Sequence, residues 1–248
     1  MGGNMEKDTK SYLFNGGIAI AVGLILSALV GGWFFSSVAS NDSITVTGSA
    51  KRRIKSDLVV WKAGVSYQAP TVADAYRAVS SDIPKIKAYL VSKGIPETEM
   101  TISAITTSTI RNTNQYGGET GEITGYALSQ EILVRSKDVD KIAVVAREST
   151  ELINQGIVIQ SSNPQFYYTA LGDLKVEMLG EAAKDAKNRA EQIAASTDNS
   201  VGAVKSAKMG VLQITPPDST EVSDYGTYDT GTIDKDITAV VNITFGIR

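Results

Sequence analysis

The chain opens with a long uncharged segment between two short charged stretches. Residues 11–41 contain no Asp, Glu, Lys or Arg. As a helix, residues 13–38 would be about 39 Å long at roughly 1.5 Å per residue, against a bilayer hydrocarbon core of about 30 Å. The pattern predicts a single transmembrane helix over residues 13–38, preceded by a short tail of residues 1–12.

A cleaved signal peptide is the alternative interpretation, because Ser37-Val38-Ala39 is compatible with a small-residue cleavage site. The apolar run is, however, longer than the usual signal-peptide core of about 7 to 15 residues. Three aromatic residues also lie at its far end, where an interfacial belt would meet the lipid headgroups: Trp33, Phe34 and Phe35. These features favour a retained anchor, so we expect residues 13–38 to lie in the lipid bilayer.

Four small residues recur at every fourth position of the predicted transmembrane helix: Ala19, Gly23, Ser27 and Gly31. On one helix face they would let a second helix approach closely, which makes them candidate contacts for helix packing. The ordinary richness of transmembrane helices in small residues explains the stripe equally well.

The predicted orientation places residues 1–12 in the cytoplasm and residues 44–248 outside the membrane. Basic residues argue for the reverse, since four of them follow the segment: Lys51, Arg52, Arg53 and Lys55. Those charges fall inside the predicted folded domain, and long domains translocate largely regardless of charge. We therefore keep the extracytoplasmic assignment.

Residues 44–248 show the alternating and helical patterns of an α+β domain. A short strand is predicted at residues 44–48, and a half-buried strand at residues 59–67, where apolar and mostly polar residues alternate. Thr71 can cap a helix whose apolar residues recur at spacings of three and four as far as Leu90.

A long hairpin follows, formed by a β-branched run at residues 101–110 and an alternating run at residues 126–134. Asp138 or Ser136 can cap the next helix, and residues 157–160 are predicted to form a short strand. The resulting order, β-α-β-β-α-β, is that of a ferredoxin-like unit.

A second α+β subdomain is predicted from the remaining sequence. Apolar residues recur with helical spacing over residues 171–193, and strands are predicted at residues 203–214 and 237–247. Residues 215–236 between those strands include two consecutive prolines and six acidic residues without apolar periodicity. We expect an exposed, flexible acidic loop there. The predicted fold class is α+β, with a transmembrane helix followed by two α+β subdomains.

Composition removes several classes of chemistry. The chain has no Cys and no His, which excludes thiol catalysis, thiolate metal sites, Ser-His-Asp hydrolysis and His-ligated zinc. A formal net charge of −3 gives no electrostatic footprint for nucleic acid. We therefore expect no enzyme, no cofactor, no bound metal and no nucleic-acid partner.

Two acidic clusters give only weak chemical patterns. Glu119 and Glu122 lie in a glycine-rich hairpin tip, where solubility and turn geometry explain them better than paired-carboxylate catalysis. Asp224, Asp229 and Asp234 are five residues apart, a spacing that fits no EF-hand loop.

Aromatic residues supply the candidate partner contacts of the domain. Phe166, Tyr167 and Tyr168 precede the third predicted helix, where core packing is the commoner role of such a cluster. Tyr225 and Tyr228 lie in the predicted acidic loop.

Six segments follow one another from residue 44 to the C-terminus: ITVTGSA, SDLVVWKAGV, TVADAYRAVSSDIPKIKAYLVSKGI, ITGYALSQEILVRSKDVDKIA, LGEAAKDAKNRAEQIAAS and ITAVVNITFGI. This ordered set resembles the SIMPL-domain family, the YggE-like exported bacterial proteins. The resemblance implies an α+β domain of the bacterial envelope, ring-like or cage-like homo-oligomers in some members, stress tolerance in others, and no established catalytic residues.

Three function classes follow from these observations. The favoured one is a single-pass protein of the bacterial cell membrane, with its domain in the periplasm, that self-assembles into a large homo-oligomer. The alternative is an exported binding module for a small molecule or a protein. An enzyme without His or Cys has the least support.

Overall fold

A computed structural model describes residues 21–32, 42–113, 116, 118–221 and 223–248. The strands are β1 Ser43–Lys55, β2 Leu58–Ala69, β3 Met100–Ile102, β4 Thr106–Thr113, β5 Glu119–Ser136, β6 Ile159–Ser161, β7 Gln165–Tyr167, β8 Val201–Met209, β9 Gln213–Thr215, β10 Thr227–Tyr228 and β11 Asp234–Ile247. The helices that follow the first strand are α2 Val72–Ser92, η1 Glu97–Glu99, α3 Val139–Glu148, η2 Ser149–Gln155 and α4 Leu171–Ala195.

The chain divides into two compact units. The larger unit comprises residues 47–186 and 208–242, and the smaller unit comprises residues 1–46, 187–207 and 243–248. The fold class is α+β, as predicted, with two sheets.

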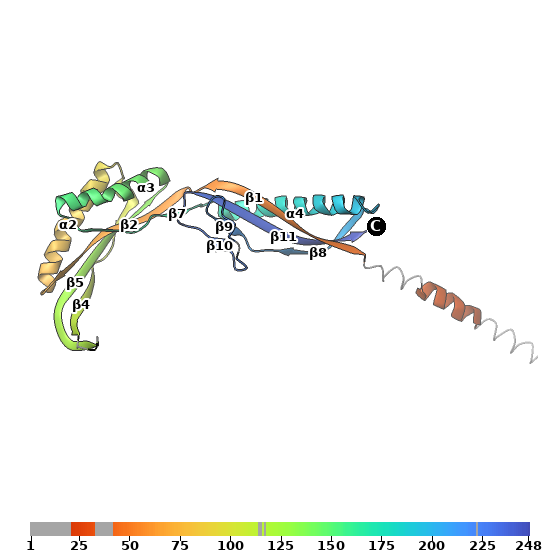
Figure 1. The fold of residues 1–248 in the computed structure, drawn as a ribbon, viewed down its shortest axis with the longest axis horizontal. Helices are drawn as coiled ribbons and strands as arrows, with labels where there is room; N and C mark the ends of the chain where they lie inside the picture. Colours follow the sequence, from red (N-terminus) through yellow and green to blue (C-terminus); the bar gives the residue numbers. More distant parts are fainter. Residues whose placement is uncertain (1–20, 33–41, 114–115, 117, 222) are drawn as a thin grey trace, which may run out of the picture. The chain divides into compact units, whose positions relative to one another are not determined.

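A six-stranded antiparallel sheet lies in the larger unit. Its order is β3-β5-β2-β6, with β4 paired to β5 and β7 paired to β2. Helices α2 and α3 lie against one face of this sheet (Figure 1). The sequence of elements from β2 to β6 is therefore the predicted β-α-β-β-α-β unit, with the second predicted strand divided into β3 and β4.

The core of this unit fills the space between the sheet and the two helices. Its fully buried side chains include Val59, Trp61, Ile132 and Val134 from the strands and Ile86, Leu90 and Ile142 from the helices. The indole Nε1 of Trp61 donates a hydrogen bond of 3.0 Å to Ser161 Oγ. A large buried aromatic residue thus keeps its polar atom satisfied.

Side-chain caps begin both helices where the sequence predicts them. Thr71 Oγ1 accepts a hydrogen bond of 3.2 Å from the amide of Asp74 at the start of α2. At the start of α3 the cap is Asp138, whose carboxylate accepts from the amide of Lys141 at 3.1 Å. Ser136, the other candidate, instead accepts a hydrogen bond from the amide of Asp138. Such caps satisfy amides that have no partner inside the helix.

The second sheet has the order β1-β11-β9-β10, with β8 paired to β11. Its first strand is far longer than predicted, because the prediction ended the strand at Gly48 whereas β1 continues to Lys55. Gly48 and Ala50 are buried but too small to give a strong apolar signal. The prediction of residues 203–214 as one strand is also wrong, since two strands, β8 and β9, occupy that region.

Gly48 explains how β1 and α4 pack within the larger unit. A Cβ atom at this position would lie only 2.6 Å from the Cβ of Ala186, and the backbone of Ala182 is also too close for it. Ala182 and Ala186 are both fully buried. Small residues on the strand and the helix therefore allow backbone contact that larger side chains would prevent.

The predicted acidic loop of residues 215–236 is more structured than expected. It contains β10 and the first three residues of β11, and Lys235 and Asp236 are almost completely buried. The prediction of an exposed loop is therefore wrong at its C-terminal end. The cause is ion pairing of those two residues, which gives no hydrophobic periodicity in the sequence.

Residues 21–32 form a helix whose side chains are all exposed in the isolated chain. Within the ranges that the structure describes, no helix is both long enough and apolar enough to cross a bilayer. The remainder of the predicted anchor, residues 13–20 and 33–38, lies outside the described residues.

Candidate functional site

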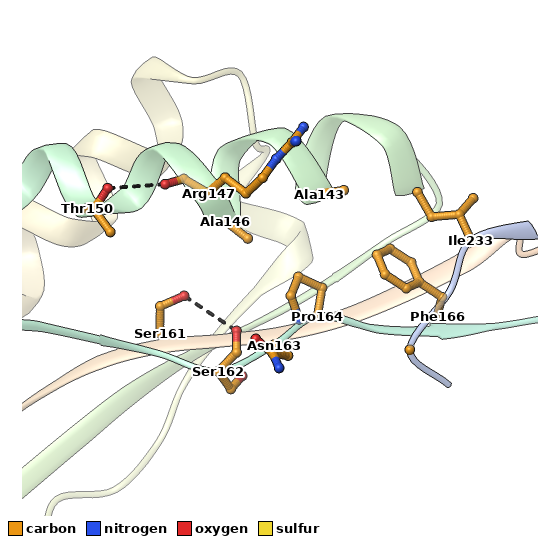
Figure 2. A pocket seen from close by; sticks show the side chains of 11 residues that line it. Ala143, Ala146, Arg147, Thr150, Ser161, Ser162, Asn163, Pro164, Phe166 and Ile233 are labelled. Carbon is orange, nitrogen blue, oxygen red and sulfur yellow. Dashed lines mark hydrogen bonds between the residues drawn. The ribbon is translucent and has the colours of Figure 1, made fainter. Parts of the chain in front are cut away.

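A cavity of about 710 Å³ lies in the larger unit, between α3, the segment that joins β6 to β7, and the loop that precedes β11 (Figure 2). Helix α3 supplies Ala143, Ala146 and Arg147, and η2 supplies Thr150. The remaining lining residues are Ser161, Ser162, Asn163, Pro164 and Phe166 from β6, the joining segment and β7, and Gly231 and Ile233 from the loop. The volume is within the range of about 300–1,000 Å³ that is usual for small-molecule sites.

A β-bulge forms the floor of the cavity. β2 pairs with Ser161 through Ala63 and with Gln165 through Val60. Two residues of β2 therefore face three residues of the partner segment, 162–164. One extra residue of this kind locally breaks the ladder and bends the strand. Ser162 secures the bend, because its amide donates to the carbonyl of Lys62 at 3.0 Å.

The roof of the cavity is a stripe of α3 with small side chains. Ala143 and Ala146 are close to Phe166 and Pro164 in Figure 2, and neither alanine is large enough to reach across the gap. Ala146 is only 8% exposed, so it faces the interior rather than solvent. The space thus results from alanine at two inward positions, opposite a bulged strand.

The loop that closes one end of the cavity is built around Asp229. Its carboxylate accepts hydrogen bonds from the amides of Gly231 at 2.8 Å and Thr232 at 3.2 Å. Burial alone would raise the pKa of Asp229, but hydrogen bonds from Thr232, Gly231 and Lys235 outweigh it and hold the pKa below its ordinary value. The buried Lys235 pairs with this carboxylate at 3.0 Å and donates to the carbonyl of Thr232 at 2.6 Å.

Asp236, the next residue, ties this region to β1. Its side chain is 2% exposed and accepts from Arg53 Nε at 2.9 Å, from the amide of Asp218 at 2.9 Å and from Lys51 Nζ at 3.0 Å. The Arg53 guanidinium, followed by the Asp218 amide, holds the pKa of Asp236 far below its usual range. The carboxylate is therefore ionised throughout the physiological pH range.

The cavity combines apolar walls with one charged side chain, Arg147. Its hydroxyl groups are already engaged: Thr150 Oγ1 donates to the carbonyl of Arg147, and Ser161 Oγ accepts from Trp61. Within the described part of the chain, neither the Arg147 guanidinium nor the Asn163 carboxamide has a hydrogen-bond or ion-pair partner. These groups are consequently available to a ligand.

The predicted membrane-helix contacts can be located only in part. Gly23, Ser27 and Gly31 lie on the described helix of residues 21–32, and a Cβ at either glycine would meet no atom within 4 Å. Ala19 lies outside the described residues, as do the predicted interfacial aromatics Trp33, Phe34 and Phe35.

The candidate aromatic contacts divide into buried and exposed residues. Phe166 belongs to the core and also lines the cavity, while Tyr167 and Tyr168 are half-buried. Tyr225 is 97% exposed and Tyr228 is 48% exposed. Core packing is thus the role that the structure gives Phe166, and only the two loop tyrosines are well exposed to a partner.

The acidic clusters do not form a metal site within the described ranges, where no group of three or more potential ligands is found. Glu119 lies in β5 at the end of the hairpin, and Glu122 accepts a hydrogen bond from Asn112 at 3.2 Å. Of the three evenly spaced aspartates, Asp224, Asp229 and Asp234, it is Asp229 whose carboxylate bonds to its own turn and to Lys235.

The sequence did not predict the cavity. Its lining residues come from separate parts of the chain, are mostly small or apolar, and form no motif in the sequence. The available signal is Asn163-Pro164 between two short strand patterns, because proline within a strand points to an edge or a bulge.

The sequence model of the SIMPL family, described as a protein of unknown function (DUF541), matches residues 44–245. The match begins within β1 and ends within β11, so it includes every residue of the cavity. Comparison with curated proteins gives no match.

Proposed function

The chain belongs to the SIMPL family of proteins of unknown function, and on that premise we propose that it is a membrane-anchored protein of the bacterial envelope that assembles into a large homo-oligomer. In this proposal its role is structural, with no catalytic residues. The proposal rests chiefly on one feature, the ribbon formed by β4 and β5.

This ribbon extends beyond the packed part of its own sheet. β2 pairs with β5 only as far as Tyr126, whereas β4 continues to pair with β5 as far as Glu119. The side chains of residues 111–113 and 121–124 are exposed, and the tip lies beyond α2 and α3 in Figure 1. Because a two-stranded ribbon is only marginally stable alone in water, contact with another molecule would stabilise it.

β4 is also an edge strand with little protection against pairing. Among the strands that the structure describes, β5 is its single partner. Residues 101–110 along this edge contain no charged residue and no proline, two devices by which natural edge strands avoid association. The pairing becomes irregular only after Ile110. A strand of a second copy can therefore add to this edge through its backbone.

The N-terminal segment supports attachment to the membrane. Residues 11–41 carry no charge, and a helix through residues 13–38 would exceed the thickness of the hydrocarbon core. Anchoring would confine every copy to two dimensions with residues 44–248 on the extracytoplasmic side, which favours association. Gly23 and Gly31 would then be available for close helix contact.

The test replaces Thr107 and Thr109 of β4 by lysine in the full-length chain. Both side chains are exposed, so the monomer should still fold, whereas like charges facing each other across paired strands cost about 0.2–1 kcal/mol per pair. We expect the unmodified chain in mild detergent to be a large particle by light scattering. The double variant should need about fivefold or more protein to reach half assembly, if two or more such pairs form.

The matched control places two lysines at exposed positions of α2, Ala73→Lys and Ala88→Lys, and should assemble normally. A monomeric unmodified chain at micromolar concentration would exclude the proposed assembly. If the β4 variant and the α2 variant both assembled as well as the unmodified chain, the protein would still be a homo-oligomer, but β4 would not be its interface.

A further inference from the structure

We propose that the cavity beneath α3 binds a small monocarboxylate with an apolar body of one or two rings. The inference goes beyond assembly, since every lining residue belongs to a single copy of the chain. It specifies which small molecule the binding-module hypothesis would require.

The apolar walls of the cavity indicate that the body of the ligand is apolar. Ala143, Ala146, Pro164, Phe166 and Ile233 present carbon atoms to the cavity from three different segments. Ring faces pack well against Phe and Pro, and displacement of water from such walls favours binding. The bulged floor and the alanine roof leave room that no side chain of the described structure fills (Figure 2).

The charges around the cavity indicate that the ligand carries an anionic group. Arg147 is the single charged residue in the lining. The acidic residues nearest to it in α3 already have cationic partners, because Asp140 pairs with Lys55 at 2.7 Å and Glu148 pairs with Lys93 at 2.8 Å. Glu148 shares Lys93 with Glu151, which lies 3.1 Å from the same ammonium group. Among the described residues no acidic side chain pairs with Arg147 itself, although the whole chain is acidic.

A guanidinium is suited to a carboxylate, because its parallel N–H groups can donate two hydrogen bonds to the two oxygens. Figure 2 shows the Arg147 side chain running along α3, with its guanidinium directed away from Pro164 and Phe166. In this proposal the exposed side chain of Arg147 turns on binding, so that its guanidinium meets the carboxylate at the opening. Asn163, an exposed residue of the lining, could add an amide N–H donor if its side chain also turned toward the opening.

The experiment titrates the full-length chain with 2-naphthoate and, separately, with its neutral analogue 2-naphthylmethanol, by saturation-transfer NMR in deuterated detergent. For a ligand of this size the usual binding free energy per atom gives a Kd on the order of 0.1–1 mM. Arg147→Met should weaken naphthoate binding about tenfold, which is the ordinary effect of one charge-assisted contact. The affinity for naphthylmethanol should stay unchanged.

Two further variants distinguish the contribution of the Arg147 charge to binding from that of the cavity itself. Arg77→Met removes an exposed positive charge near the N-terminus of α2, where Arg77 pairs with Asp74, and should leave both affinities unchanged. Ala146→Leu extends a side chain into the cavity and should abolish binding of both ligands. Circular dichroism confirms that each variant is folded, and comparison within one detergent cancels partition of the ligands into micelles.

Absence of saturable naphthoate binding to the unmodified chain at 1 mM, the upper end of the expected Kd range, would overturn the proposal. Equal naphthoate affinity of the unmodified chain and Arg147→Met would overturn the assignment of the anionic group. Neither result depends on the oligomeric state, so failure of this proposal is distinguishable from failure of the proposed assembly.

Discussion

At the scale of single residues, Asp236 carries a charge on which the fold depends. Its carboxylate joins β1 to the segment before β11 through Arg53, Lys51 and the amide of Asp218. Because these contacts favour the ionised form, the folded-state pKa lies below the unfolded value of about 3.9. The stabilisation is therefore fully present above about pH 4 and is lost as the pH falls further toward the folded-state pKa.

Asp236→Asn should lower the free energy of unfolding by about 2 kcal/mol at pH 7, since it removes charge-assisted hydrogen bonds from a buried group. Thermal melts at pH 7 and pH 3 provide the measurement. The difference in melting temperature between Asp236→Asn and the unmodified chain should be smaller at pH 3 than at pH 7. Asp218→Asn is the control: its side chain is 81% exposed, so loss of its ion pair with Arg53 should cost less than about 1 kcal/mol. If this difference in melting temperature were the same at both pH values, the charge of Asp236 would not contribute to stability.

At the scale of elements, the close approach of β1 to α4 requires glycine at position 48. Gly48→Ala would place a Cβ against the backbone of α4, and we expect a loss of about 1–3 kcal/mol, the usual cost of overpacking. Gly121→Ala in β5 is the matched control, because no atom lies within 4 Å of its Cβ position. Urea denaturation of both variants provides the measurement. If Gly48→Ala were as stable as Gly121→Ala, β1 and α4 could move apart to accommodate the Cβ without loss of free energy of unfolding.

The same elements show what the sequence could and could not predict. Helices with a side-chain cap and a continuous apolar stripe, α2 and α3, were predicted because the signal is local. The full length of β1 was missed, because Gly48 and Ala50 are buried by contact with a distant helix rather than by their own size. The cavity could not be predicted for a related reason. It is the space that small side chains leave unfilled, and no type of residue in the sequence indicates such a space. The burial of Lys235 was missed because its partner, Asp229, is recognisable only once the turn is formed.

At the scale of the whole molecule, we expect residues 42–248 to contain what their folding requires. The described strands of both sheets lie within residues 43–247, and the side-chain caps of α2 and α3 come from Thr71 and Asp138 of the same domain. A chain of residues 42–248 should therefore be soluble and melt cooperatively, because a core of this size is sufficient. If β4 is the dominant interface, this shortened chain should also form a large particle in light scattering.

If the shortened chain folds but remains monomeric while the full-length chain assembles, the N-terminal segment would be required for assembly. Gly23→Leu and Gly31→Leu in the full-length chain would then be the decisive variants, because they separate helices that pack through small residues. Aggregation of the shortened chain, or a melt without a cooperative transition, would contradict the independence of the domain.

The bulge between β6 and β7 has a consequence for evolution, because it depends on the number of residues and not on their identity. β2 contributes two residues where its partner contributes three. A homologue with one residue fewer between Ser161 and Gln165 could pair without interruption and still place Phe166 beside Val59, so its core would survive while the floor of the cavity would straighten. We therefore expect the length of this segment, rather than the identity of its residues, to determine whether a related chain keeps the bulged floor.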